Sequence, residues 1–142
     1  MTPGQALTSA QHHLLGPADQ ALHHASTDVP AFRPDTLVTD ALGTMRGRRF
    51  ESASAVAVLD DERRIVGIAT IEAMFAADDE QRLRDVMDPT PPVVAPRTDQ
   101  EHAAWQAVQR AEPYLAVVDE KRTFLGLISP QRLLGILLQE HD

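Results

Sequence analysis

Acidic side chains gather in the middle of the chain, and their oxygen atoms are suited to binding a divalent cation. Between positions 78 and 101, seven acidic residues stand against three basic ones. Mg²⁺ takes oxygen ligands and keeps several of its waters, so carboxylates that face one another across an interface can hold it, and the ion relieves their mutual repulsion. The candidate ligands are Asp85, Asp88, Asp99, Glu101, Glu140 and Asp142.

The candidates in the middle of the chain also have an ordinary structural explanation. Thr98 and Glu101 have the spacing of a capping box, in which both side chains bind free N–H groups at the start of a helix. Asp99 would stabilise the same helix end through the helix dipole. The sequence leaves the structural and the metal-binding explanations open.

Other reactive groups do not form a catalytic pattern. The histidine pairs at 12–13 and 23–24 lie about three helical turns apart, too far to share a metal ion. Arg46, Arg48 and Arg49 could bind a phosphate or simply stabilise a helix C-terminus. The chain has no cysteine, no phosphate-binding loop and no hydrolase signature. We therefore expect that the protein is not an enzyme.

Composition limits the partners and the compartment. The 142 residues carry a net charge of -8, whereas a nucleic-acid partner requires a concentrated basic face. The absence of cysteine and of a secretory signal favours a cytoplasmic location. No apolar run approaches the roughly 20 residues of a membrane-spanning helix.

The chain contains the same segment twice. Residues 55–75, "AVAVLDDERRIVGIATIEAMF", match residues 115–134, "LAVVDEKRTFLGLISPQRLL": from Val56 on, each residue pairs without a gap with the one numbered 59 higher. The match pairs Asp60 with Asp119 and Arg63 with Arg122. Such a repeat predicts a pseudo-symmetric molecule with a cleft between its two copies.

Each copy is predicted to be a β-hairpin that leads into a helix. Apolar runs flank a charged turn in both copies, which is typical of a hairpin. Thr70 and Ser129 then stand where a hydroxyl caps the following helix, and Pro130 suits the first helical position. A short strand and a helix precede each hairpin, at an offset of 62 residues. The fold class is therefore α/β (α+β), with two β-α-β-β-α units packed about a pseudo-twofold axis.

This arrangement resembles a tandem pair of CBS domains, also called a Bateman module. The residues that carry the resemblance are the helix "TLVTDALGTM", the hairpin "VAVLDDERRIVGIAT" and its second copy. The segments "VMDPTPPVVAPRTDQEHAAW" and "FLGLISPQRLLGILLQEHD" resemble more narrowly the cytosolic CBS region of MgtE-type magnesium transporters. The expected organisation is an N-terminal helical segment packed on the first repeat or on a partner (1–28), a first repeat (29–79), a linker (80–92), a second repeat (93–139) and the start of an acidic connecting helix (140–142).

The resemblance implies a nucleotide site in the cleft. CBS pairs commonly bind ATP or AMP with a Thr or Ser at the start of the last helix and an Asp three residues later. Thr70 and Ser129 match the first requirement, but the Asp positions are Ala73 and Arg132. The ribose-binding carboxylate is thus absent from both repeats, and Arg132 is left as a group that could meet a phosphate.

Two functions follow from the resemblance. The first is a regulatory module that senses Mg²⁺ and controls the gating of an MgtE-like divalent-cation transporter on the cytosolic face of the membrane. The alternative is a free-standing CBS pair that binds an adenine nucleotide and regulates another protein. Both imply a homodimer, and the first also implies a transmembrane transport domain as partner.

Overall fold

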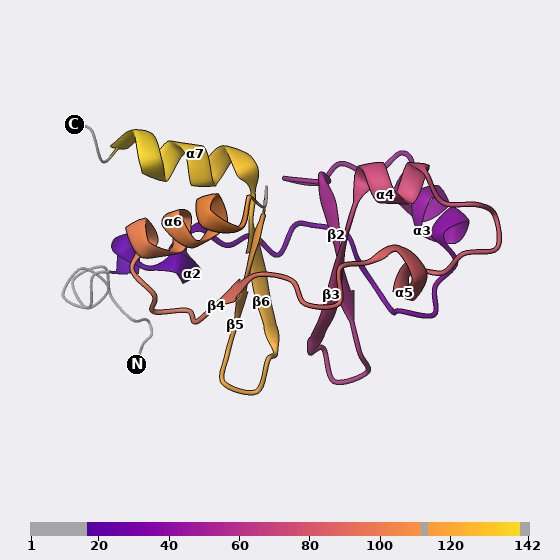
Figure 1. The fold of residues 1–142 in the computed structure, drawn as a ribbon, viewed down its shortest axis with the longest axis horizontal. Coiled ribbons are helices and arrows are strands. Elements are labelled where there is room, and N and C mark those ends of the chain that lie inside the picture. The colour runs from indigo at the N-terminus through magenta and orange to yellow at the C-terminus, as the bar shows by residue number, and fades with distance from the viewer. Residues whose placement is uncertain (1–16, 112–113, 140–142) are drawn as a thin grey trace.

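The computed structural model describes residues 17–111 and 114–139. Figure 1 shows two sheets side by side at the middle of the molecule, with the helices of each half on the outer side of its sheet. In the first repeat, the sheet order is β1-β2-β3, with β1 parallel to β2 and β2 antiparallel to β3. Its elements are β1 (Ala31–Phe32), α3 (Val38–Met45), β2 (Ala55–Leu59), β3 (Ile65–Thr70) and α4 (Ile71–Phe75).

The second repeat has the same order of elements and the same sheet topology, β4-β5-β6. The predicted fold class, two β-α-β-β-α units, is therefore confirmed. The elements are β4 (Val93–Val94), α6 (Gln100–Arg110), β5 (Leu115–Val118), β6 (Phe124–Ile128) and α7 (Pro130–Gln139).

The hairpin turns are built in the same way in both repeats. Arg63 and Arg122 adopt left-handed backbone angles, with φ of 64° and 68°. The carboxylates of Asp60 and Asp119 accept hydrogen bonds from turn N–H groups, those of Arg64 and Thr123 at 2.9 Å. Hydrogen bonds from a carboxylate to backbone N–H groups a few residues further on fix the conformation of the turn.

A pseudo-twofold relation joins the two repeats. The N–H of Ile65 donates to the carbonyl of Arg122 at 3.0 Å, and the N–H of Phe124 donates to the carbonyl of Arg63 at 2.9 Å. Residues of one repeat thus make the same hydrogen bond to the other in both directions. Between the sheets lies one buried apolar cluster: Val29, Ala55, Ala57, Leu59, Ile65, Ile68, Tyr114, Ala116, Val118, Phe124 and Leu127.

A short helix before each repeat packs on the opposite repeat. The helix α2 (Ala21–His24) places buried Ala21 among side chains of α6 and α7, and α5 (Leu83–Val86) places buried Leu83 among side chains of α3 and α4. Isolated β-bridges join Ser26 to Leu127 and Asp88 to Ile68. The helix α2 of the N-terminal segment, which follows a 3₁₀ turn η1 (Pro17–Asp19), therefore packs on the second repeat. We had expected this segment to pack on the first repeat or on a partner.

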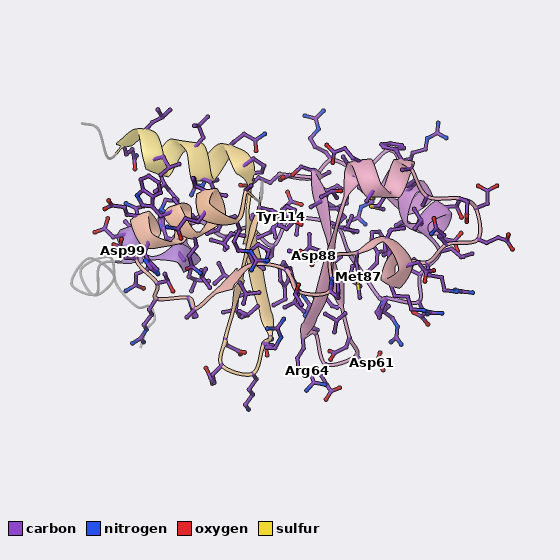
Figure 2. The ribbon with its side chains drawn as sticks, in the orientation of Figure 1. Asp61, Arg64, Met87, Asp88, Asp99 and Tyr114 are labelled. Carbon is purple, nitrogen blue, oxygen red and sulfur yellow. The ribbon has the colours of Figure 1, made fainter. Side chains whose placement is uncertain are left out.

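The crossing segments require glycine in β3 and β6. A Cβ added to Gly126 would lie 2.8 Å from the Cβ of Ala25, and the backbone φ of Gly126 is +155°. A Cβ added to Gly67 would strike the flexible side chain of Met87, which lies beside β3 (Figure 2), and would lie 3.0 Å from the carbonyl oxygen of Asp88, but the φ of Gly67 is not in the positive range that strains other residues. An added side chain is therefore less well tolerated at Gly126, where the N-terminal segment crosses β6, than at Gly67.

We expect Gly126→Ala to lower the free energy of unfolding by about 1–3 kcal/mol, because backbone and side chain must both shift. Urea denaturation measures this loss. Gly43→Ala is the matched control: it lies in α3 with nothing within 4 Å of its added Cβ, so alanine should stabilise the helix by about 0.5–1 kcal/mol. Unchanged stability of Gly126→Ala would contradict the close crossing.

The hairpin carboxylates should make stability fall in acid. Backbone N–H bonds, chiefly those of Arg64 and Thr123, hold the pKa values of Asp60 and Asp119 below the ordinary 3.8. Their stabilising effect is therefore complete above the unfolded-state pKa and is lost as the pH falls through the folded-state value. We expect the double variant Asp60→Asn/Asp119→Asn to be less stable than the unmodified chain at pH 7. Between about pH 4 and pH 2, where carboxyl groups titrate, it should lose less stability than the unmodified chain.

The control for this pH dependence is Glu62→Gln/Glu120→Gln, which removes the same charge from the neighbouring turn positions. Urea denaturation at each pH compares the three proteins. If both double variants flattened the acid limb equally, net charge and not the turn hydrogen bonds would be the cause.

Candidate functional site

Thr70 and Ser129 lie at the starts of α4 and α7. The hydroxyl of Thr70 accepts a hydrogen bond from the N–H of Ala73 at 3.2 Å, and that of Ser129 accepts one from the N–H of Arg132 at 3.3 Å. Ser129 is the buried polar residue of the core, and Thr70 is half-buried. Both hydroxyls are therefore helix caps, and their role in nucleotide binding stays a prediction.

Arg132 is exposed and lies beside a hollow between α2 and α7. This hollow has a volume of about 270 Å³ and is lined by His24, Arg132 and four residues of α7. Burial lowers the pKa of His24, and the charge of Arg132 adds to this, although the hydrogen bond from Nε2 to Gln100 at 2.6 Å acts in the opposite direction. A neutral His24 beside Arg132 leaves the guanidinium as the charged group of this hollow at neutral pH.

The predicted metal ligands lie apart from one another. Figure 2 shows Asp88 near the centre of the molecule and Asp99 at the outer end of the second repeat. Among the described residues, no group of three or more His, Cys, Asp or Glu side chains could hold a metal ion. Glu140 and Asp142 lie outside the described residues. The described candidates thus do not gather into a group of three within one copy, and the Mg²⁺ site stays a prediction.

Three of these carboxylates instead bind backbone N–H groups nearby. Asp85 accepts from Arg82 at 2.8 Å, Asp88 from Thr90 at 2.9 Å, and Asp99 from Glu101 at 3.0 Å. Each of these bonds closes a turn or caps a helix start.

The predicted capping box at Thr98 is wrong by one residue. Asp99 is the N-cap of α6, and its carboxylate also accepts from the N–H of His102 at 3.3 Å. The carbonyl of Thr98 accepts a hydrogen bond from the N–H of Ala21 in α2 at 2.7 Å, whereas the carbonyl of Asp99 accepts the first bond of the helix, from the N–H of Ala103 at 2.9 Å.

A basic hollow lies between the two repeats. It measures about 560 Å³ and is lined by Ile65 and Val66 of β3, by Pro89, Thr90 and Pro91 before β4, and by Arg110 and Arg122 of the second repeat. Nη2 of Arg110 donates to the carbonyl of Thr90 at 3.0 Å, and Nη2 of Arg122 donates to the carbonyl of Ile65 at 3.4 Å.

The sequence analysis did not identify the basic hollow, although it paired Arg122 with Arg63. The signal was present in the repeat, since arginine recurs at both hairpin turns and near the end of the first helix in both units, as Arg48 and Arg110.

An apolar groove lies between α6 and α7. Its volume is about 440 Å³, and small residues of α6, such as Ala104 and Ala107, form one side while leucines of α7 form the other. Val108 and Leu134 of its lining and Trp105 of α6 are each about half exposed (49%, 58% and 51%). Exposed apolar groups gathered in this way are typical of a surface that another protein covers.

Within the described residues, no helix is long and apolar enough to cross a membrane.

Comparison with known proteins identifies the two repeats. The family model described as "CBS domain" matches residues 22–80 and 83–139, which together make up most of the chain.

Among curated proteins, the magnesium transporter MgtE of Thermus thermophilus is 28% identical over 90 residues, which are 63% of this chain and 20% of that protein. The chain therefore spans about a fifth of the length of this relative.

Two solved structures show the same fold. The cytosolic domain of the Mg²⁺ channel MgtE in complex with ATP is 24% identical, with a TM-score of 0.79, 89% of this chain covered and 53% of that one. CBSX2 in complex with AMP is 22% identical, with a TM-score of 0.72, 87% of this chain covered and 98% of that one. Matched by the family model in both halves and folded as the sequence predicted, the chain belongs to the CBS-domain family, as a tandem pair that resembles the cytosolic CBS region of MgtE.

Proposed function

We propose that this CBS pair is the cytosolic regulatory module of an MgtE-like transporter of Mg²⁺ or another divalent cation, and that it is not an enzyme. The sequence similarity to MgtE of Thermus thermophilus supports this choice of partner. Because the chain corresponds to only a fifth of that protein, the transport domain is part of the proposal.

The crossed packing of the leading helices is the observation that carries the proposal. Ala21 of α2 shares one buried cluster with Leu133 and Ile136 of α7. In an MgtE-like protein, the acidic connecting helix expected after α7 leads toward the membrane domain. A ligand that changes how the two repeats pack would therefore shift α7 relative to the rest of the module, and a shift of this kind is how a binding domain controls a pore.

Dimerisation is the second part of the proposal. The apolar groove between α6 and α7 would be covered by a second copy of the chain, which removes its exposed leucine and tryptophan surface from water. The acidic side chains that stand apart in one copy would then meet across copies. Mg²⁺ bound between them would favour the compact dimer.

The alternative is a CBS pair that binds ATP or AMP and regulates another protein. The basic hollow between the repeats favours it, and solved relatives contain ATP or AMP. Positions 73 and 132, where the family has a ribose-binding Asp, are however occupied by Ala73 and Arg132. The ribose therefore loses a charge-assisted hydrogen bond worth roughly 1.5–3 kcal/mol. Thr70, Ser129 and Arg132 would be the remaining contacts of this alternative site.

Thermal melting of the chain at fixed ionic strength tests the two functions. With MgCl₂ we expect saturable stabilisation at millimolar concentrations, because the ion binds the folded dimer; at 100 times the dissociation constant it amounts to about 2.7 kcal/mol. Asp85→Asn/Asp88→Asn/Asp99→Asn should abolish the shift. Asn still caps helices, so folding is retained.

The matched control is Asp40→Asn/Glu72→Gln/Glu120→Gln, three exposed acidic positions away from the candidates. It should keep the Mg²⁺ response. A shift with ATP or AMP but none with MgCl₂ would select the nucleotide alternative, and an equal loss of the Mg²⁺ response in both triple variants would contradict a specific ion site.

Sedimentation of the chain tests the dimer. Leu134→Glu should raise the dimer dissociation constant at least tenfold, because it places a charge in the apolar groove (about 1.4 kcal/mol per tenfold). Leu22→Glu, at a leucine of α2 that is 46% exposed, is the control and should leave the dimer intact. A monomer in the unmodified chain, or equal effects of both changes, would contradict this interface.

A further inference from the structure

We infer that the docking of α2 on the second repeat is sensitive to pH, with neutral His24 holding the segment in place and protonated His24 releasing it. This property belongs to the chain itself, whichever protein the module regulates. It requires no ligand in the hollow between the repeats.

The helix α2 is attached to the second repeat chiefly through polar contacts. The N–H of Ala21 donates to the carbonyl of Thr98 at 2.7 Å, and the N–H of Leu22 donates to the carbonyl of Pro96 at 2.9 Å. Ala21 is buried, whereas Leu22 is half exposed. Because an alanine side chain removes little apolar surface from water, a change in one polar contact alters the docking of α2 noticeably.

His24 makes one of these polar contacts. Its Nε2 atom lies 2.6 Å from Oε1 of Gln100, the first residue of α6. The same imidazole and the guanidinium of Arg132 line the hollow of about 270 Å³ between α2 and α7. Protonation of His24 would therefore place a second positive charge in this hollow, and like charges repel more strongly where protein partly replaces water. Release of α2 would move the imidazolium into water and relieve this repulsion.

The surroundings of His24 favour its neutral form. Burial is the largest cause of its lowered pKa, and the charges of Arg132 and of His23 add to it, while hydrogen bonds with Gln100 and with the backbone of Ala18 act in the opposite direction. The described residues that line the hollow include no acidic side chain. The other titratable side chains described on η1, on α6 and just before α6 are exposed to water: Asp19, Arg97, Asp99, Glu101, His102 and Arg110.

The sign of the pH dependence follows from the lowered pKa of His24. In the released segment the imidazole titrates near its ordinary value of 6.5, whereas in the docked segment it titrates at a lower pH. Docking is therefore strongest above the ordinary pKa and weakens as the pH falls from that value toward the lower one. The change falls between neutral and mildly acidic pH, where histidine is the side chain that ordinarily titrates.

The other crossing segment offers a comparison within the same molecule. The helix α5 docks on the first repeat through two equivalent backbone hydrogen bonds, donated by Leu83 at 2.9 Å and by Arg84 at 3.0 Å. By the offset of 62 residues, Val86 stands in the place of His24. Val86 packs against the apolar cluster of the first repeat, and Leu83 is buried in that cluster. The docking of α5 thus has an apolar side chain where the docking of α2 has a titratable one.

Amide hydrogen exchange of the full chain tests this pH dependence, followed by NMR and divided at each pH by the intrinsic exchange rate. Between about pH 7.5 and pH 5.5, on either side of the ordinary imidazole pKa, protection of the N–H groups of Ala21 and Leu22 should fall about threefold or more. Protection of the equivalent N–H groups of Leu83 and Arg84 should stay within about twofold, because Val86 does not titrate.

Three variants assign the effect to His24. His24→Gln should abolish the fall in protection, because glutamine can keep a polar contact with Gln100 but does not titrate. The matched control is His23→Gln at the exposed neighbour, which removes another imidazole and should keep the fall. Gln100→Glu places a carboxylate beside His24 and favours the imidazolium, so protection of Ala21 and Leu22 should no longer fall in acid.

Three results would overturn the inference: no fall in protection of α2 in the unmodified chain, an equal fall in α5, or an undiminished fall in His24→Gln. Thermal melting at neutral pH checks that each variant folds. If His24→Gln does not fold, or leaves α2 unprotected at every pH, Gln100→Glu provides the comparison because it keeps His24. An undiminished fall in that variant would likewise contradict the role of His24.

Discussion

The apolar cluster between the two sheets is the constraint on which the rest of the structure depends. The residues of β2 and β5 are buried on both faces, so each three-stranded sheet has one face for its own helices and one for the other sheet. A single repeat would leave the second face in water. The hydrogen bonds between Ile65 and Arg122 and between Phe124 and Arg63 then fix how the two sheets meet.

Because the sheets share this core, the segments before each repeat lie against the opposite half. The tight approach of Ala25 to Gly126 and of Met87 to Gly67 follows from that crossing. The two repeats are thus connected by the core and by two crossing chains.

The polar residues of the molecule divide into two groups. Carboxylates such as Asp60, Asp85 and Asp99 are used to satisfy N–H groups at turns and helix starts, and this explains their positions without a ligand. Arg110 and Arg122 are different, because they line a hollow and are paired with carbonyls alone in the contacts described. The chain as a whole is acidic, which suits a cation, whereas the charged side chains of the basic hollow are arginines.

The sequence by itself determined the repeat and the order of elements in each unit, because these depend on local periodicity and on spacing along the chain. Its resemblance to tandem CBS pairs pointed to the family. The sequence also identified Thr70 and Ser129 as caps, since a cap is set by its immediate neighbours. Only the tertiary structure decided that α2 packs on the second repeat, because this packing brings together residues far apart in the chain, such as Ala21 and Thr98, which are hydrogen-bonded although 77 residues apart. It likewise brought Arg110 and Arg122 to one hollow, since their distance from β3 is set by the packing of the sheets and not by their spacing in the chain.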